Sequence, residues 1–325
     1  MHRLVLVGTG FMAETHASNL ARMDDTSIMA VVSPSGPESF VEGFSLDATA
    51  HTDLEVAIET CDADAAVVCT PTHTHRGLIE TALDHETAVF CEKPLATSLA
   101  ETSAIRDAVA GADVPLMVGH VVRYFPEYAT TKREVDDGAV GRAGVARARR
   151  VSPVPDWGSD DWFAEAEKSG GVFVDMAIHD FDYLRWVWGD VKRVFARITG
   201  DPPAQHGTAT LRFESGAVGC VEASWAQPTT RELTMELELA GDEGVVQVNS
   251  DAAPYRAFTG ENTTVENTLA ENGYYRELAH FLDCLESGAD PDVGISEATE
   301  ALRLSVAARR SARRGTPVAL TEVTE

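Results

Sequence analysis

The chain has 325 residues, 44% of them hydrophobic, and a net charge of −26 from 26 basic and 52 acidic side chains. This length allows two domains with separate cores. The charge argues against nucleic acid or an anionic membrane surface as a partner, and no apolar run approaches the ~20 residues that cross a bilayer. Residues 1–8 are too short and wrongly flanked for a signal peptide, so we expect a cytoplasmic protein.

The cysteine and lysine contents bear on metal sites, on disulfide bonds and on the source of the protein. The five cysteines are scattered and none forms a Cys-x-x-Cys pair. The sequence therefore supports neither a zinc site nor a disulfide framework, and we expect no metal. There are four lysines, many Asp, Glu and Ala residues, and a pI near 4.6. This composition resembles that of proteins from salt-loving organisms, so a halophilic source is a compositional hypothesis.

The first part of the chain alternates strand and helix patterns. Apolar runs predict strands at residues 4–7, 27–32, 65–69, 88–91 and 115–118. Helical patterns follow most of them, at residues up to about 22, around 78–83, and at about 98–110 and 124–136. Such alternation predicts βαβ units and an α/β fold with a doubly wound parallel sheet. We assign residues 1–122 to this domain.

The pattern changes near residues 138–144. Strand-like runs now follow one another, at residues 145–151, 191–198, 207–213, 218–226, 233–240 and 245–249. One helix is predicted at about 171–188, and two more at about 274–285 and 296–310. Residues 123–325 are therefore predicted to form an α+β domain with an open, mainly antiparallel sheet. We expect the last helices to pack back on the first domain.

A glycine loop follows the first predicted strand. Gly8-x-Gly10-x-x-Ala13 in a strand–turn–helix context is typical of dinucleotide binding, although a tight turn without a ligand is the alternative. Gly8 allows the turn, and Gly10 lets the backbone approach the pyrophosphate at the helix start. The cofactor contacts expected here are Gly8, Gly10, Phe11 and Met12.

The end of the second strand bears on the choice of cofactor. Domains that bind NAD usually place Asp or Glu there, on the ribose hydroxyls. Here Ser33-Pro34-Ser35 follows the strand, so nothing repels a 2′-phosphate, and the hydroxyls of Ser33 and Ser35 could bind one. The sequence permits NAD or NADP.

Glu92-Lys93-Pro94 comes directly after the apolar run 88–91. A lysine at the carboxyl end of a strand in an α/β sheet points into the crevice where such sheets bind ligands. Pro94 fixes its own φ and restricts Lys93, so a stiff backbone presents the ammonium group. The alternative is a solvated lysine at a strand end.

Asp175 and His179 are four residues apart in the helix predicted at 171–188, so we expect them on one helix face. A carboxylate beside an imidazole orients the ring and supports its charged form, as a general base requires. A buried pair that only joins the helix to the sheet is the alternative. Asp182 and Arg185 are expected to be ion-paired or solvated.

Together these segments resemble the family of glucose-fructose oxidoreductase and inositol 2-dehydrogenase, called Gfo/Idh/MocA. The resemblance covers nearly the whole chain. It includes the glycine loop with His16 further along the helix, Glu92-Lys93-Pro94, and Asp175-x-x-x-His179. It also includes Thr70-Pro71-Thr72-His73-Thr74-His75, where the family commonly has Thr-Pro-Asn-x-x-His, so Thr72 replaces the asparagine.

The resemblance implies an NAD(P)-dependent oxidoreductase that acts on a secondary alcohol of a sugar, inositol or related polyol. It implies that Lys93 binds the reacting oxygen and that His179, tuned by Asp175, exchanges the proton, although Lys93 could take the proton instead. The further cofactor contacts implied are Thr70, Pro71, His75, Glu92 and Lys93. It also implies a homodimer or homotetramer formed through the open face of the second sheet.

The substrate pocket has no motif of its own. His120 and Arg123 follow a strand at the crevice end, and Tyr274 or Tyr275 could reach the site from the next helix. Trp157 could stack on a sugar ring, with a core or interface tryptophan as the alternative. Two other functions use the same fold: glycoside cleavage through transient oxidation by bound NAD, and nucleotide sensing without catalysis.

Overall fold

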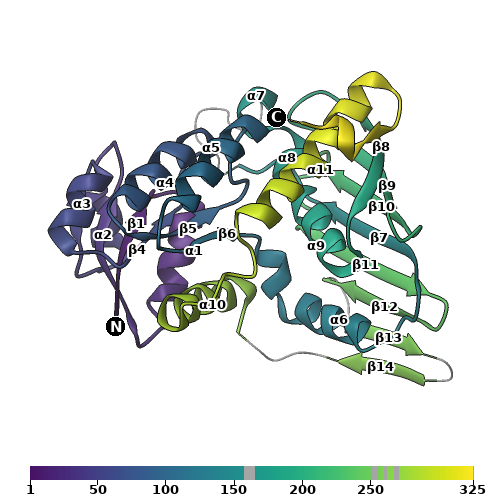
Figure 1. Cartoon of the computed structure of the whole chain (residues 1–325), viewed down its shortest axis with the longest axis horizontal. Coiled ribbons are helices and arrows are strands. Elements are labelled where there is room, and N and C mark those ends of the chain that lie inside the picture. Colours follow the sequence, from purple (N-terminus) through teal and green to yellow (C-terminus); the bar gives the residue numbers. More distant parts are fainter. Residues whose placement is uncertain (157–164, 251–254, 260–261, 267–270, 325) are drawn as a thin grey trace. The chain divides into compact units, whose positions relative to one another are not determined.

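A computed structural model of the chain describes residues 1–156, 165–250, 255–259, 262–266 and 271–324. These residues form two compact units, each with its own sheet (Figure 1). Unit 1 comprises Met1–His120 and Tyr274–Thr299, and unit 2 comprises Val121–Gly273 and Glu300–Thr324. Within the described ranges, no helix is long and apolar enough to cross a membrane.

The sheet of unit 1 is parallel throughout. In the order in which they pair, its strands are β3 (Thr49–His51), β2 (Thr26–Val32), β1 (His2–Val7), β4 (Ala65–Val68), β5 (Ala88–Glu92) and β6 (Leu116–Gly119). Every residue of β4, β5 and β6 is buried, as in strands that are covered on both faces. The predicted doubly wound parallel sheet is confirmed.

Helices cover both faces of this sheet. They are α1 (Phe11–Leu20), α2 (Glu38–Gly43), α3 (Leu54–Cys61), α4 (His75–Asp84), α5 (Leu99–Ala110) and α10 (Gly273–Ser287), with a short 3₁₀ helix η1 (Thr72–Thr74). Figure 1 shows α4 and α5 on one face and α1 and α10 on the other. Although α10 comes late in the chain, it packs on β5, where the ring centroids of Phe90 and Phe281 are 5.8 Å apart.

The sheet of unit 2 is mainly antiparallel, as predicted. In the order in which they pair, its strands are β14 (Asn262–Glu266), β13 (Tyr255–Thr259), β12 (Gly244–Asn249), β11 (Thr234–Gly241), β7 (Ala143–Val151), β10 (Val218–Ser224), β9 (His206–Phe213), β8 (Val191–Thr199) and β15 (Val318–Ala319). Among the pairs in the described residues, β7 and β10 run parallel. In β9 buried residues alternate with exposed ones, so one face of the sheet packs on a core.

Unit 2 also contains helices, several of which pack on its sheet. They are η2 (Val121–Tyr124), α6 (Pro126–Asp136), α7 (Ala166–Ser169), α8 (Val172–Asp175), α9 (Ile178–Trp188), α11 (Ile295–Arg314, of which Ile295–Thr299 belongs to unit 1) and η3 (Leu320–Glu322). α9 packs against β7 and β10. Elsewhere on the sheet, Arg149 of β7 forms a cross-strand ion pair with Glu236 of β11 at 2.9 Å.

The segment predicted as one helix at 171–188 is instead two helices, α8 and α9. The Ala177 N–H donates to the Val172 carbonyl, five residues back rather than the four of an α-helix. The chain therefore turns at Met176, with Asp175 at the end of α8 and His179 near the start of α9. The prediction of one continuous helix through Asp175 and His179 is wrong.

Candidate functional site

The glycine loop and Lys93 lie at the same edge of the unit 1 sheet. Gly8 follows β1, Thr70 comes shortly after β4, and Lys93 directly follows β5. Because β1, β4 and β5 are parallel neighbours, their carboxyl ends meet at this edge. The strand order reverses between β1 and β4, which is the point where open α/β sheets bind ligands.

The two glycines of the loop have different surroundings. Gly8 has φ +112°, and a Cβ atom placed there would lie 2.6 Å from the carbonyl oxygen of Cys69, so the fold itself requires glycine. A Cβ atom on Gly10 would meet nothing within 4 Å, so packing within the protein does not require glycine at that position. The open space at Gly10 lies at the start of α1, where Phe11 and Met12 form the first turn. This end of a helix attracts anions.

Two serine hydroxyls follow the end of β2. Ser33 is buried, and its Oγ atom lies 3.1 Å from the Oγ atom of Ser35. The structure thus brings together the two hydroxyls that the sequence suggested for a ribose or its 2′-phosphate.

His75 connects the loop after β4 to the loop after β5. The buried ring lies with Nε2 2.9 Å from the Thr70 carbonyl oxygen and Nδ1 3.1 Å from the Pro94 carbonyl oxygen. Burial lowers the pKa of His75, and the carbonyl contacts only partly oppose this effect. The neutral ring has one N–H, so it donates a hydrogen bond to one of these two carbonyl oxygens at a time.

Glu92 is the buried neighbour of Lys93. Its Oε1 atom accepts a hydrogen bond from Nε2 of His16 at 2.8 Å, and its Oε2 atom accepts one from the backbone N–H of Lys93 at 3.1 Å. Burial alone would raise the pKa of Glu92, but His16 and the charge of Lys93 outweigh it, so the pKa is lowered. Glu92 therefore holds a negative charge beneath the Lys93 backbone.

Glu277 of α10 was not identified from the sequence. It is fully buried, and burial together with the charge of Glu92 raises its pKa well above the ordinary range. The sequence pattern could have pointed to Glu277, because this residue lies beside Leu278 and one helical turn before Phe281, on the apolar face of the helix. An acidic residue on such a face is unusual and marks a polar cluster.

In unit 2, Asp175 and His179 are both half-buried, at the end of α8 and in the first turn of α9. Arg123 of η2 is buried and donates Nε and Nη2 to the two oxygens of Asp182, at 2.7 and 2.5 Å. The expectation that Asp182 is ion-paired is confirmed. Arg185 likewise pairs with Asp190, at 3.0 Å.

The other predicted substrate contacts are distributed over the two units. His120 directly follows β6 in unit 1 and is buried. Tyr274 is the second residue of α10, with its ring centroid 6.0 Å from that of His16. Trp157 lies outside the described residues. Lys93 belongs to unit 1, whereas Asp175, His179 and Arg123 belong to unit 2.

Comparison with known families gives a match for each unit. Residues 2–120 match a model of an oxidoreductase family with an NAD-binding Rossmann fold. Residues 128–247 match a model of the GFO/IDH/MocA C-terminal domain.

Individual relatives are similar over nearly their full length. The chain is 30% identical to scyllo-inositol 2-dehydrogenase (NAD(+)) of Bacillus subtilis, covering 98% of this chain and 96% of that protein. It is 29% identical to myo-inositol 2-dehydrogenase of Thermotoga maritima, covering 99% of each. A crystal structure of a probable dehydrogenase from Thermotoga maritima superposes with a TM-score of 0.86, at 28% identity, over 99% of this chain and 100% of that one.

Proposed function

Because the chain belongs to the Gfo/Idh/MocA family of oxidoreductases, we propose that it transfers a hydride between a nicotinamide cofactor and a secondary alcohol or ketone of a sugar, inositol or related polyol. The observation that carries this proposal is the placement of the glycine loop, after β1, and Lys93, after β5, at the same edge of one parallel sheet. Two relatives of nearly equal length are named inositol dehydrogenases, which supports a polyol as substrate.

The residues at this edge fit a dinucleotide. Open space at Gly10 leaves room for a pyrophosphate at the start of α1, and the hydroxyls of Ser33 and Ser35 fit a ribose or a 2′-phosphate. Bound NAD or NADP supplies the hydride acceptor. We assign the following contacts to it: Gly8, Gly10, Phe11, Met12, Ser33, Ser35, Thr70, Pro71, His75, Glu92 and Lys93.

We assign the transfer of the substrate's hydroxyl proton to Lys93 and His179. During oxidation the substrate hydroxyl loses its proton while its carbon loses the hydride, so a base must lie within hydrogen-bond reach of that oxygen. Lys93 either binds the oxygen or takes the proton itself. His179, tuned by the carboxylate of Asp175, is the other acceptor.

Unit 2 is proposed to bind the substrate and to form the homodimer or homotetramer through its sheet. The proposed substrate contacts are Arg123 and Trp157 of unit 2, with His120 and Tyr274 of unit 1. The bidentate ion pair with Asp182 fixes the orientation of the Arg123 guanidinium group.

A panel of inositols and sugars, tested with NAD⁺ and with NADP⁺, examines this function. We expect absorbance at the reduced-nicotinamide band to rise with at least one cyclic polyol. Turnover of a glycoside without any change in that band would instead indicate cleavage through transient oxidation. Tight binding of the cofactor with no turnover across the panel would contradict the proposal and favour a nucleotide sensor.

Gly8→Ala and Gly10→Ala are expected to separate folding from cofactor binding. Gly8→Ala forces a left-handed φ and a clash with the Cys69 carbonyl, so it is expected to cost about 1–3 kcal/mol of unfolding free energy. Gly10→Ala is expected to cost less than about 1 kcal/mol, the scale for Ala at a helix start, yet to weaken NADH or NADPH binding. Urea unfolding and fluorescence titration measure the two effects. Full cofactor affinity in Gly10→Ala would contradict the placement of the pyrophosphate.

A further inference from the structure

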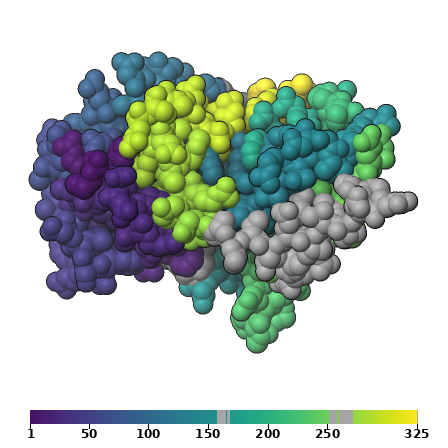
Figure 2. Space-filling model, turned by 90° about the horizontal axis from the view of Figure 1, so that it is seen from below, coloured from purple at the N-terminus to yellow at the C-terminus, as the bar shows by residue number. Residues whose placement is uncertain are grey.

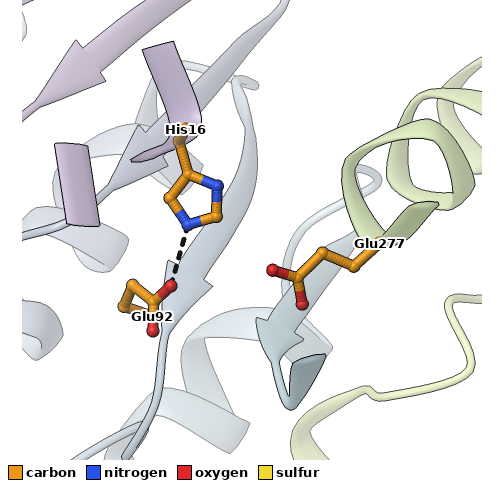
Figure 3. Close-up of side chains that lie close together, drawn as sticks. All are labelled: His16, Glu92 and Glu277. Atoms are coloured by element: carbon orange, nitrogen blue, oxygen red, sulfur yellow. Dashed lines mark hydrogen bonds and ion pairs between the residues drawn. The ribbon is translucent and has the colours of Figure 1, made fainter. Parts of the chain in front are cut away.

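His16, Glu92 and Glu277 form a buried cluster inside unit 1 (Figure 3). They come from three elements that are distant in sequence: α1, β5 and α10. One ring nitrogen of His16 and one oxygen of each carboxylate lie within 4.8 Å of one another. The relative exposures are 0% for His16, 6% for Glu92 and 0% for Glu277, so bulk water does not solvate these groups.

Among the described residues, two members of the cluster have buried polar atoms without a hydrogen-bond partner: Nδ1 of His16 and both carboxylate oxygens of Glu277. Figure 3 shows the carboxylate of Glu277 pointing toward the space that it shares with His16 and Glu92. A buried carboxylate without a partner is strongly unfavourable, so another group must offset it.

A proton on Glu277 would offset only part of this deficit. It would remove one negative charge, but the carboxyl O–H and C=O would still need hydrogen-bond partners. A divalent cation removes the charge deficit, because its two positive charges balance the two carboxylates while the neutral imidazole of His16 adds a nitrogen ligand.

We propose that His16, Glu92 and Glu277 bind a divalent transition-metal ion, with Zn²⁺ as the best match. Imidazole nitrogen is a ligand for Zn²⁺ and its neighbours in the first transition row, whereas Mg²⁺ and Ca²⁺ prefer oxygen alone. Zinc binds nitrogen and carboxylate oxygen at about 2.0–2.2 Å, which puts opposed ligand atoms at most ~4 Å apart. The present spacing therefore needs only a small contraction.

Binding would rearrange one hydrogen bond of the cluster. Nε2 of His16 now donates to Oε1 of Glu92. On binding, the ring proton moves from Nε2 to Nδ1, so the imidazole stays neutral while the Nε2 lone pair coordinates the metal, together with Oε1 of Glu92. Oε2 of Glu92 keeps its hydrogen bond from the Lys93 N–H, the kind of outer contact that orients a metal ligand.

This site revises the expectation of no metal, which was based on cysteine spacing. It goes beyond the proposed hydride transfer, with which it shares Glu92, because the ion would join α10 to α1 and β5 rather than meet a substrate. A second group, Glu55, Glu59 and His85, has similar spacing but is largely exposed, and it serves only as a control.

Zinc binding by the full-length chain tests the proposal. A chelator first removes any bound metal ion, and the protein is then titrated calorimetrically with ZnCl₂. Excess MgCl₂ is present to occupy weak sites made of oxygen alone on the acidic surface. We expect one tight zinc ion per chain in the wild type and in Glu59→Gln. In Glu277→Gln, which keeps the shape of the side chain, we expect binding weakened more than about tenfold, since loss of even an outer contact costs that much.

Thermal unfolding provides a second measurement. Zinc is expected to raise the unfolding midpoint temperature of the wild type and of Glu59→Gln but not that of Glu277→Gln. A ligand that binds the folded state stabilises that state. If Glu277→Gln does not fold, His16→Gln allows the same comparison. Wild-type protein that binds no tight zinc overturns the proposal whatever the variants do, and so does equal binding by Glu277→Gln. The cluster would then be explained by a proton on Glu277.

Discussion

Lys93→Ala is expected to lower kcat by about 10²-fold or more, the usual scale for a group that exchanges or steadies a proton. The cofactor is still expected to bind, because the contact of Lys93 with Glu92 is made by the backbone N–H and survives the substitution. Steady-state kinetics with the best substrate of the polyol panel, together with fluorescence titration of NADH or NADPH, measures both quantities.

Two further lysine variants make this result specific. Lys192→Ala removes an exposed lysine of β8 and is expected to leave kcat unchanged. Lys93→Arg keeps the positive charge but replaces a compact ammonium with a planar group that does not release its proton, so it is expected to remain impaired. Turnover of Lys93→Ala at the wild-type rate would refute the assignment of Lys93 to the reacting oxygen.

Asp182→Ala is expected to destabilise unit 2 by about 3–5 kcal/mol, because it leaves the buried charge of Arg123 without its bidentate partner. The side chains of Arg123 and Asp182 are 3% and 2% exposed, so water cannot replace the lost carboxylate. All five tryptophans lie between residues 121 and 273, so urea unfolding followed by tryptophan fluorescence reports on this unit.

Asp190→Ala is the matched control for this ion pair. Asp190 pairs with Arg185, which lies in α9 as Asp182 does. The Asp190 side chain is 71% exposed, so its loss is expected to lower the unfolding free energy by less than about 1 kcal/mol. Replacing both buried partners, as Arg123→Met with Asp182→Leu, is expected to cost less than Asp182→Ala alone, since no charge is left buried. Equal losses in Asp182→Ala and Asp190→Ala would contradict this account.

The strands of unit 1 could be predicted because each buried parallel strand is an uninterrupted apolar run, as in Ala65–Val68. The elements between Val32 and Ala65 were missed, since β3 has only three residues, α2 six and α3 eight, which are short stretches in which to establish a period. The break between α8 and α9 was missed for another reason. It depends on the hydrogen bond between Ala177 and Val172, and no glycine or proline stands at the turn to indicate it.

The candidate site was predictable where residues are close in sequence. The glycine loop and Glu92-Lys93-Pro94 are continuous segments, and their common edge follows from the parallel order of the strands. The environment of Glu92 was not predictable, because His16 and Glu277 reach it from a helix 76 residues before it in the chain and from one far after it. Contacts between distant segments depend on how helices cover the sheet, and a single sequence carries no direct record of that.

The late position of α10 has a consequence for protein synthesis. Unit 1 takes Tyr274–Thr299 from beyond most of unit 2, so its six strands leave the ribosome well before its last helix exists. At ~5–20 residues per second, residues 121–299 take roughly 10–40 s to be made. During that interval Phe90 lacks Phe281, and the Val118 N–H lacks its acceptor, the Val293 carbonyl. The nascent chain is then expected to be most susceptible to proteases and most dependent on chaperones.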